Sequence, residues 1–357
     1  MADVKIFADY IEESAISQLK AISENSAFED EAIRIMPDAH AGSGCVVGFT
    51  STFRNGRIVP AVVGVDIGCG VLAVETTMKP SEKTYKKLDR VIASHVPTGT
   101  GHFDDPDEET LAVVDSLTFA MGSEAKLLAA RSLGTLGGGN HFIELDQHPG
   151  TKRLWLTVHT GSRNLGLQIA RHHQEIASLG PGYLDGNLAD AYLHDLAVAQ
   201  QFARDNRRAI VETIRERMGF NTFAEVESVH NYIDLEHGIT RKGAIAAYKG
   251  QSVVVPLNMA AGIVLGKGKG VSDWNDSAPH GAGRMLSRSA AQAKISLDQY
   301  RKDMREVYSS CVGKRTLDES PRAYKTIGPT SQHRPKVITV TMVVLRNPLM
   351  MKSFGCA

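Results

Sequence analysis

Six clusters of glycine beside polar residues constrain this chain more than any other feature of its sequence. They fall at residues 41–44, 64–70, 134–139, 161–166, 266–270 and 281–283. Glycine adopts positive φ angles and lets the backbone approach a ligand closely. We find no internal repeat or low-complexity segment beside them, so we expect several of these turns to converge and build one site from loops.

Apolar runs between the clusters predict the regular elements. We predict strands at residues 58–63, 154–158, 253–255 and 337–345, and helices at 108–130, 187–218 and 284–308. Strands and helices are interspersed without the regular alternation of a doubly wound fold. The length of 357 residues allows one large domain or two. We predict a single α+β domain spanning residues 1–357, with a mixed β-sheet core and surrounding helices.

Composition excludes several classes of protein. Hydrophobic residues make up 42% and charged residues 22%, which is typical of an ordinary globular protein. The 40 basic residues balance the 40 acidic ones, which argues against a protein that coats nucleic acid but allows a local basic groove. Four cysteines are too few for a disulfide scaffold, and we see neither a signal-peptide core nor an apolar run of about 18 residues. We therefore predict a cytoplasmic protein without membrane attachment.

Four short segments carry candidate metal ligands, and three of them contain glycine. Segment 64–70 carries Asp66 and Cys69, and three later segments carry His141, His159 and His230. Carboxylate, imidazole and a shared thiolate could hold one or two divalent cations, and these donors do not choose among manganese, zinc, cobalt and nickel. The alternative is structural: a buried cysteine beside a turn aspartate, and turn histidines satisfied by solvent.

His280 is the candidate for phosphate chemistry. It precedes the predicted helix 284–308, whose free N–H groups and dipole favour phosphate, and Arg284 and Arg288 would lie on one face of that helix. His280 could bind a phosphate or attack one as a nucleophile, with its other ring nitrogen bound to a carboxylate. The alternative is a helix-capping histidine with two solvated arginines. Arg163 is a further candidate for clamping a phosphate.

Eight other histidines lack a glycine-rich context, and we interpret them as surface or packing residues: His95, His102, His148, His172, His173, His194, His237 and His333.

Seven motifs then occur in order along the chain. They are M-P-D-A-H-A-G (36–42), G-V-D-I-G-C-G (64–70), G-G-G-N-H-F-I-E (137–144), V-H-T-G-S-R (158–163), H-N (230–231), R-K-G-A (241–244) and H-G-A-G-R-M-L-S-R (280–288). From about residue 36 to the C-terminus, this order and spacing resemble the RtcB family of RNA ligases. The resemblance implies a single α+β domain of the family's own type.

The resemblance also implies a role for each matching residue. Asp66, Cys69, His141, His159 and His230 correspond to the ligands of two manganese ions, with Cys69 bridging. His280 corresponds to the histidine that attacks GTP and becomes linked to GMP, and Asp38 to the carboxylate that orients it. The implied nucleotide contacts are Asn140, His141, Phe142, Ile143, Glu144, His230, Asn231, Pro256, Leu257, Asn258, Met259, Ile263, His280, Gly281, Ala282, Gly283 and Lys352.

The family's reaction joins an RNA 2′,3′-cyclic phosphate or 3′-phosphate end to a 5′-hydroxyl end, in RNA repair or tRNA splicing. Its substrates are single-stranded or tRNA-like RNA ends, which can be splayed into a pocket, and GTP. The resemblance further implies an archease-type activator, and we expect a monomer. We predict a basic rim for RNA phosphates at Arg163, Arg241, Lys242, Arg284 and Arg288.

The chain departs from the family pattern on the nucleotide side. Leu257 and Asn258 stand where the family has glycine and serine, and Ile263 stands where it has another serine, so two hydroxyls are absent and bulk is added. The segment after Lys352 also differs, and we interpret the chain as a divergent paralogue. Two alternatives remain. One is a dinuclear metal phosphoesterase that acts on RNA ends, because the same ligands serve hydrolysis. The other is a non-catalytic protein that binds RNA ends or nucleotide.

Overall fold

Two five-stranded sheets form the centre of the fold in the computed structural model, which describes residues 2–325, 338–342 and 346–352. One sheet has the strand order β1-β2-β3-β9-β8 and the other β15-β5-β6-β4-β7. A three-stranded sheet, β11-β12-β14, and a two-stranded sheet, β10-β13, complete them. Strands β1 and β2 pair in parallel and the other paired strands are antiparallel, so the β structure is mixed.

The strands are β1 (Asp3–Ile6), β2 (Ala32–His40), β3 (Val47–Thr52), β4 (Gly70–Thr76), β5 (Phe142–Gln147), β6 (Leu154–Thr160), β7 (Thr222–Val229), β8 (Asn231–Asp234), β9 (Ile239–Lys242), β10 (Ala244–Ala246), β11 (Ser252–Asn258), β12 (Gly262–Gly268), β13 (Ser277–Pro279), β14 (Ile338–Met342) and β15 (Arg346–Lys352). The α-helices are α1 (Glu13–Ser23), α2 (Pro60–Val63), α3 (Glu82–His95), α4 (Glu108–Asp115), α5 (Ser123–Ala130), α6 (Arg163–Ser178), α7 (Gly186–Met218), α8 (Arg288–Lys294) and α9 (Leu297–Asp303).

Strand β4 shows how the layers are built. Its side chains alternate between the two faces of the sheet. Leu72 and Val74 pack with residues of α3 and α7, including Ile92. Val71 and Ala73 pack on the opposite face with residues of β11 and β12. The sheet that carries β4 is therefore covered by helices on one side and by the β11-β12-β14 sheet on the other.

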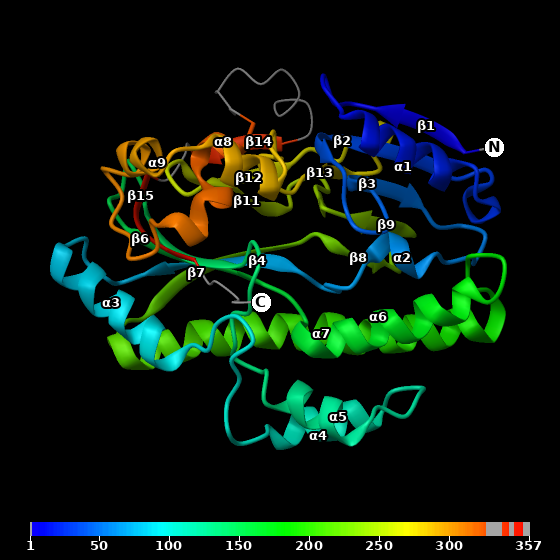
Figure 1. Cartoon of the computed structure of the whole chain (residues 1–357), viewed down its shortest axis with the longest axis horizontal. Coiled ribbons are helices and arrows are strands. Elements are labelled where there is room, and N and C mark those ends of the chain that lie inside the picture. Colours follow the sequence, from blue (N-terminus) through cyan, green and yellow to red (C-terminus); the bar gives the residue numbers. More distant parts are fainter. Residues whose placement is uncertain (1, 326–337, 343–345, 353–357) are drawn as a thin grey trace.

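The long helices lie together on one side of the molecule. Helices α6 and α7 run side by side beneath the two five-stranded sheets, and α4 and α5 lie outside them (Figure 1). Their shared core includes Ile169 of α6 and Tyr192 of α7, both fully buried. None of the helices in the described part of the chain is long and apolar enough to cross a membrane.

The predicted α+β class is confirmed, and several predicted elements are confirmed with it. The strands expected at 154–158 and 253–255 are β6 and β11, and the helix expected at 187–218 is α7. Strand β14 occupies the centre of the strand expected at 337–345, whose residues 337 and 343–345 lie outside the described part.

Three predicted elements were wrong in kind or extent. The strand expected at 58–63 is largely the short helix α2, because Pro60 has a fixed φ and no N–H and so suits a first helical turn. The helix expected at 108–130 is divided into α4 and α5, and the helix expected at 284–308 into α8 and α9. Ser287 and Ser296 accept hydrogen bonds from backbone N–H groups of α8 and α9, so each serine caps a separate helix.

Candidate functional site

Strand register brings the five predicted metal ligands together. Asp66 and Cys69 lie in the turn between α2 and β4, and Gly70 at the start of β4 is paired with both Thr160 of β6 and Val229 of β7. His159 precedes Thr160, and His230 follows Val229. His141 immediately precedes β5, where Phe142 is paired with His159. The ends of four neighbouring strands thus place the ligands at one edge of the sheet.

The five side chains form two groups that share Cys69. We call the five together the metal group. In one group, Nε2 of His159 lies 3.3 Å from Cys69 Sγ and 3.3 Å from Nε2 of His230. In the other, Nε2 of His141 lies 3.6 Å from the same Sγ and 3.0 Å from Oδ2 of Asp66. This geometry suits two cation positions joined by one sulfur.

The tautomers of two histidines test whether the metal group fits a cation. Nδ1 of His141 and Nδ1 of His159 lie 2.9 and 3.1 Å from the carbonyl oxygens of Leu136 and Asn140. A carbonyl only accepts, so each Nδ1 donates and Nε2 is the ring nitrogen that remains to bind a cation. Both Nε2 atoms lie near Cys69 Sγ, and that of His141 also lies beside Asp66 Oδ2, so a cation could bind between these donors. The residues present therefore fit a divalent metal.

Burial sets the protonation states of the metal group. It lowers the pKa of His159 and of His230 well below the ordinary value, which keeps both rings neutral as metal ligands must be. Burial and the adjacent Asp66 raise the pKa of the Cys69 thiol. Burial also opposes ionisation of Asp66, but the nearby His141 outweighs it and lowers the pKa of that carboxyl. A bound cation would convert the thiol to thiolate.

Residues behind the metal group hold its backbone in place. The Arg207 guanidinium in the middle of α7 is fully buried, and its Nη1 donates to Gly68 O at 2.8 Å and Thr160 O at 2.9 Å. These carbonyls adjoin Cys69 and His159. Asn231 Nδ2 donates to Asp66 O at 3.1 Å, and its Oδ1 accepts from Gly243 N at 3.0 Å. Asn231, predicted to contact nucleotide, therefore uses its amide to fix a ligand-bearing turn.

His280 and Asp38 form a second unit, the His–Asp pair. Nδ1 of His280 lies 2.8 Å from Oδ2 of Asp38, which also accepts from Gly281 N at 3.2 Å. Asp38 is buried. Burial raises its pKa, but the hydrogen bond from His280 and the nearby charge outweigh that effect and lower it. Because the Asp38 carboxylate accepts a hydrogen bond from Nδ1, the proton of a neutral ring lies on Nδ1 and the lone pair of Nε2 is available. The His280 ring centroid is 4.9 Å from that of His230, so the pair adjoins the metal group.

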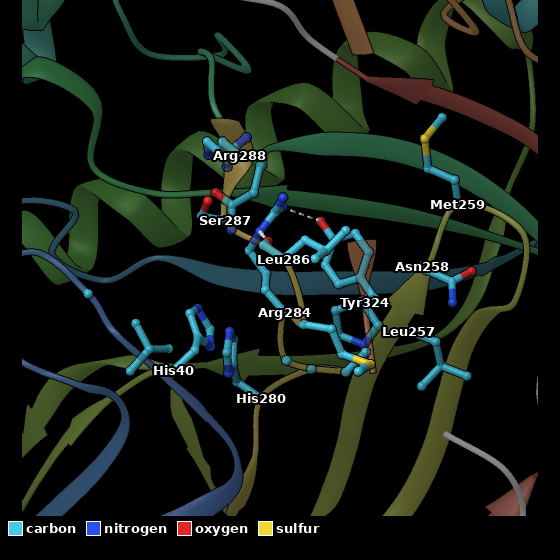
Figure 2. A pocket seen from close by; sticks show the side chains of 18 of the residues that line it. His40, Leu257, Asn258, Met259, His280, Arg284, Leu286, Ser287, Arg288 and Tyr324 are labelled. Carbon is cyan, nitrogen blue, oxygen red and sulfur yellow. Dashed lines mark hydrogen bonds between the residues drawn. The ribbon is translucent and has the colours of Figure 1, made fainter. Parts of the chain in front are cut away.

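A cavity of about 550 Å³ opens beside the His–Asp pair. Figure 2 shows His40 and His280 together on one side and Leu257, Asn258 and Met259 on another, with Arg284 and Tyr324 between. The volume is that of a small-molecule site. The predicted site residues that line this main cavity are Asn140, Phe142, Glu144, His159, Pro256, Leu257, Asn258, Met259, His280, Gly281, Ala282, Gly283, Arg284 and Arg288.

Several predicted nucleotide contacts lie elsewhere. Ile143 is fully buried in the core between the sheet and α7. Ile263 is also fully buried, and it packs with Trp155 and Val254 on the face of β12 away from the cavity, which its neighbour Gly262 lines. The expected added bulk of Ile263 beside a nucleotide is therefore wrong. His141 and His230 belong to the metal group. Lys352 ends β15, where its backbone is paired with Phe142.

The predicted basic rim is wrong for its two most buried members. Arg241 is fully buried and donates to Ser277 Oγ at 2.9 Å, while Lys242 is 8% exposed and donates to Ser43 O at 2.9 Å. Arg241 ties β9 to β13, Lys242 ties β9 to the turn between β2 and β3, and neither side chain faces solvent. Arg163 is held by Thr135 Oγ1 and Gly99 O at the start of α6.

The predicted helical face of Arg284 and Arg288 is also wrong. α8 begins at Arg288, so Arg284 lies outside it and His280 follows strand β13. Arg284 lines the cavity, but Nη2 donates to Asp318 O at 2.6 Å. Arg288 forms ion pairs with Asp318 and Glu319. The two arginines secure the segment 314–319 against the cavity wall.

Sequence reasoning missed several residues of the cavity, and two of them carry a polar ring. Tyr324 lines it with no motif to mark it. His40 lines it beside His280, and its position two residues after Asp38 in the first motif was the available signal. Among the other histidines, His173 is a buried packing residue paired with Asp195 at 2.7 Å, as expected, and His333 lies outside the described residues.

The site thus combines two groups of side chains that share a thiol and could hold cations, a histidine–aspartate pair, and a cavity of the size that takes a small molecule. A family profile described as "tRNA-splicing ligase RtcB" matches residues 18–121 and 114–352. The chain is 31% identical to the RNA-splicing ligase RtcB of Escherichia coli (strain K12), over 83% of this chain and 84% of that protein. It is 28% identical to a tRNA-splicing ligase RtcB of Aeropyrum pernix, over 84% and 83%. The chain belongs to the RtcB family.

Proposed function

We propose that this protein is an RNA ligase that joins an RNA 2′,3′-cyclic phosphate or 3′-phosphate end to a 5′-hydroxyl end through a covalent GMP on His280. The observation that carries the proposal is the His–Asp pair, which lies beside both the metal group and the main cavity. Relatives named RNA-splicing ligases, similar over most of the chain, support it.

His280 is proposed to act as the nucleophile. Its Nε2 attacks the α-phosphorus of GTP, an N–P bond forms, and the bond to the bridging oxygen breaks as pyrophosphate leaves. Asp38 holds Nδ1–H and stabilises the positive imidazole that forms. Two manganese ions in the metal group would polarise the phosphates and neutralise charge that develops during transfer.

RNA enters the proposed reaction in the later steps. Water first opens a 2′,3′-cyclic phosphate to a 3′-phosphate, whose oxygen takes the GMP from His280. The 5′-hydroxyl oxygen then attacks the RNA phosphorus, and GMP leaves. The nucleotide is proposed to occupy the main cavity, with Asn140, Phe142 and Glu144 on one wall and residues 256–259 on another. Lys352 remains a proposed guanine contact.

Labelling with GTP tests the proposal. Purified protein is incubated with Mn²⁺ and α-labelled GTP, and label on the protein is followed on a denaturing gel. We expect acid-labile label on the wild type, none on His280→Ala, and strongly reduced label on Asp38→Asn. His237→Ala is the matched control, because His237 also pairs through Nδ1 with an aspartate, Asp234 at 3.1 Å, but is more exposed and does not line the cavity.

The alternative of a dinuclear phosphoesterase makes the opposite prediction. The metal group alone would support hydrolysis of a cyclic phosphate, and this activity needs no covalent nucleotide. Two results together would replace the ligase proposal by this one. The protein would take no label from GTP or ATP with Mn²⁺, Co²⁺ or Zn²⁺, and it would convert an RNA 2′,3′-cyclic phosphate end to a 3′-phosphate end.

Three further proposals come from the family resemblance. We propose that the protein acts in the cytoplasm, that an archease-type activator increases its turnover, and that it is a monomer. Size-exclusion chromatography with light scattering tests the last of these directly.

A further inference from the structure

His40 is a second histidine in the main cavity, and the reaction outlined above leaves it unused. It ends strand β2, is partly buried, and stands beside His280 in Figure 2. The two rings have different partners, since His280 binds the carboxylate of Asp38 and His40 binds the backbone carbonyl of the same residue. The cavity therefore offers two imidazoles with different hydrogen-bond partners.

Hydrogen bonding fixes the tautomer of His40. Its Nδ1 lies 3.0 Å from Asp38 O, and a carbonyl only accepts, so Nδ1 carries the proton and Nε2 keeps a lone pair. Burial lowers the pKa of His40, and nearby His280 and Lys325 act in the same direction against the raising effect of Asp38. A neutral imidazole with a free Nε2 is a base, not a phosphate-binding cation.

Only some steps of the proposed reaction require a base. The attack of His280 on GTP uses a lone pair that is already free, and a 3′-phosphate is already an anion. Opening of the cyclic phosphate by water and sealing by the 5′-hydroxyl differ, because each nucleophile must lose a proton as the new bond forms; only sealing is common to both kinds of RNA end. A base in the cavity is therefore needed when the 5′-hydroxyl attacks.

From these observations, we propose that His40 is the general base that removes the proton of the RNA 5′-hydroxyl in the sealing step. This inference rests on the proposed ligase function. The 5′-oxygen forms a bond to the 3′-phosphorus, and the bond from that phosphorus to the GMP oxygen breaks. GMP leaves with the electron pair, and the hydroxyl proton moves to Nε2 of His40 and then to solvent.

Isolating the sealing step provides the test. An RNA strand prepared with a guanylylated 3′-phosphate is mixed with a 5′-hydroxyl strand, Mn²⁺ and excess protein, so sealing needs no earlier step. His40→Gln is expected to slow sealing by about 10²–10⁴-fold. Labelling of His280 with GTP should stay within about threefold of wild type. His102→Gln is the control, because Nδ1 of that exposed histidine also binds a backbone carbonyl, 2.9 Å away.

The pH dependence separates a base from a structural residue. The groups that face His40 are His280, Asp38, Lys325 and Glu12, which also lines the cavity. Because the pKa of His40 is lowered, the wild-type sealing rate should rise with pH below the ordinary histidine range and be level above it. The rate of His40→Gln should instead keep rising with pH, as hydroxide takes the place of the base.

Each outcome decides between the two proposals. Normal sealing by His40→Gln, or a pH profile unchanged by it, overturns the role of His40 and leaves the ligase proposal intact. Equal loss of labelling and sealing assigns His40 to positioning of the His–Asp pair and also overturns the base. A wild type that seals the prepared strand but is never labelled by GTP refutes guanylylation of His280 while still testing His40. A wild type that neither labels nor seals overturns both.

Discussion

Arg207 is the side chain whose removal most directly tests how the metal group is supported. Its guanidinium is fully buried in the middle of α7. Nη1 donates to Gly68 O and Thr160 O, and Nε donates to Glu227 Oε1 at 2.8 Å. We predict that Arg207→Met lowers both the free energy of unfolding and the affinity of the metal group for Mn²⁺. Methionine keeps an unbranched stem and the helix propensity of the residue but lacks the guanidinium, so the change removes the positive charge and its hydrogen bonds.

The expected loss is about 3 kcal/mol. Removal of one partner from a buried ion pair costs about 3–5 kcal/mol. Two features place the expected loss of stability at the lower end of this range. The Glu227 side chain is 19% exposed and has Arg204 at 3.6 Å, so water and that arginine can replace the lost partner. Nη2 of Arg207 is buried without a hydrogen bond to the described residues, so its desolvation cost disappears. This loss corresponds to a melting temperature lower by about 4 °C.

Thermal unfolding and Mn²⁺ titration measure the two effects. Arg208→Met is the matched control, because the next residue of the same helix pairs with Glu225 on the same strand but is 47% exposed, and such pairs contribute about 1 kcal/mol or less. Mn²⁺ affinity of Arg207→Met should fall about 10–100-fold. If the two variants lower the melting temperature equally, burial of Arg207 does not carry the effect and the prediction is refuted. If stability falls while Mn²⁺ affinity holds, Arg207 supports the helix packing and not the metal group.

Three further changes have defined outcomes. Cys69→Ser should weaken both cation positions and abolish the thiolate-to-cobalt absorption of the Co²⁺-loaded protein, whereas Cys45→Ser, a buried cysteine outside the metal group, should preserve it. Gly283→Ala should lower the free energy of unfolding by about 1–2 kcal/mol, because Gly283 has a φ of 75°. The added Cβ would lie 2.5 Å from the backbone oxygen of Asp38, so the change should also reduce GTP labelling. Mn²⁺ binding should persist. Asp195→Asn should destabilise the protein by about 2 kcal/mol at neutral pH in urea titrations. Burial opposes ionisation of Asp195, but hydrogen bonds from His173 and Thr118 lower its pKa, so this difference should shrink as pH falls through that lowered value.

The metal group could be predicted from sequence because its five ligands occupy four short motifs. A glycine-rich turn or the end of an apolar strand marks each of the five residues, and the order of motifs carried the family resemblance. The continuous apolar or helical runs that form β6, β11 and α7 could also be predicted. In these places local sequence and final structure agree, so reasoning from a short window succeeds.

Prediction failed where a partner distant in sequence decides the structure, or where a local cap interrupts a run that otherwise favours helix. Arg241 appears as a free cation beside a glycine, yet its guanidinium donates to Ser277, 36 residues away. The division of residues 284–308 depended on two serine caps within a sequence that otherwise favours helix. Ile263 was placed beside the nucleotide, but alternation along β12 turns it to the opposite face. Which face of a strand meets the cavity depends on the register with β11, and no local pattern states that register.

His230 explains how the separate parts of the site are held in register. It is the one residue between β7, which belongs to one five-stranded sheet, and β8, which belongs to the other. Its N–H donates to Cys69 O at 2.9 Å, and its carbonyl accepts from Ala244 N at 3.3 Å. The ring thus belongs to the metal group while lying 4.9 Å from the ring of His280. Because one backbone residue joins both sheets at this point, a cation bound by His230 would also fix how far His280 stands from the metal group.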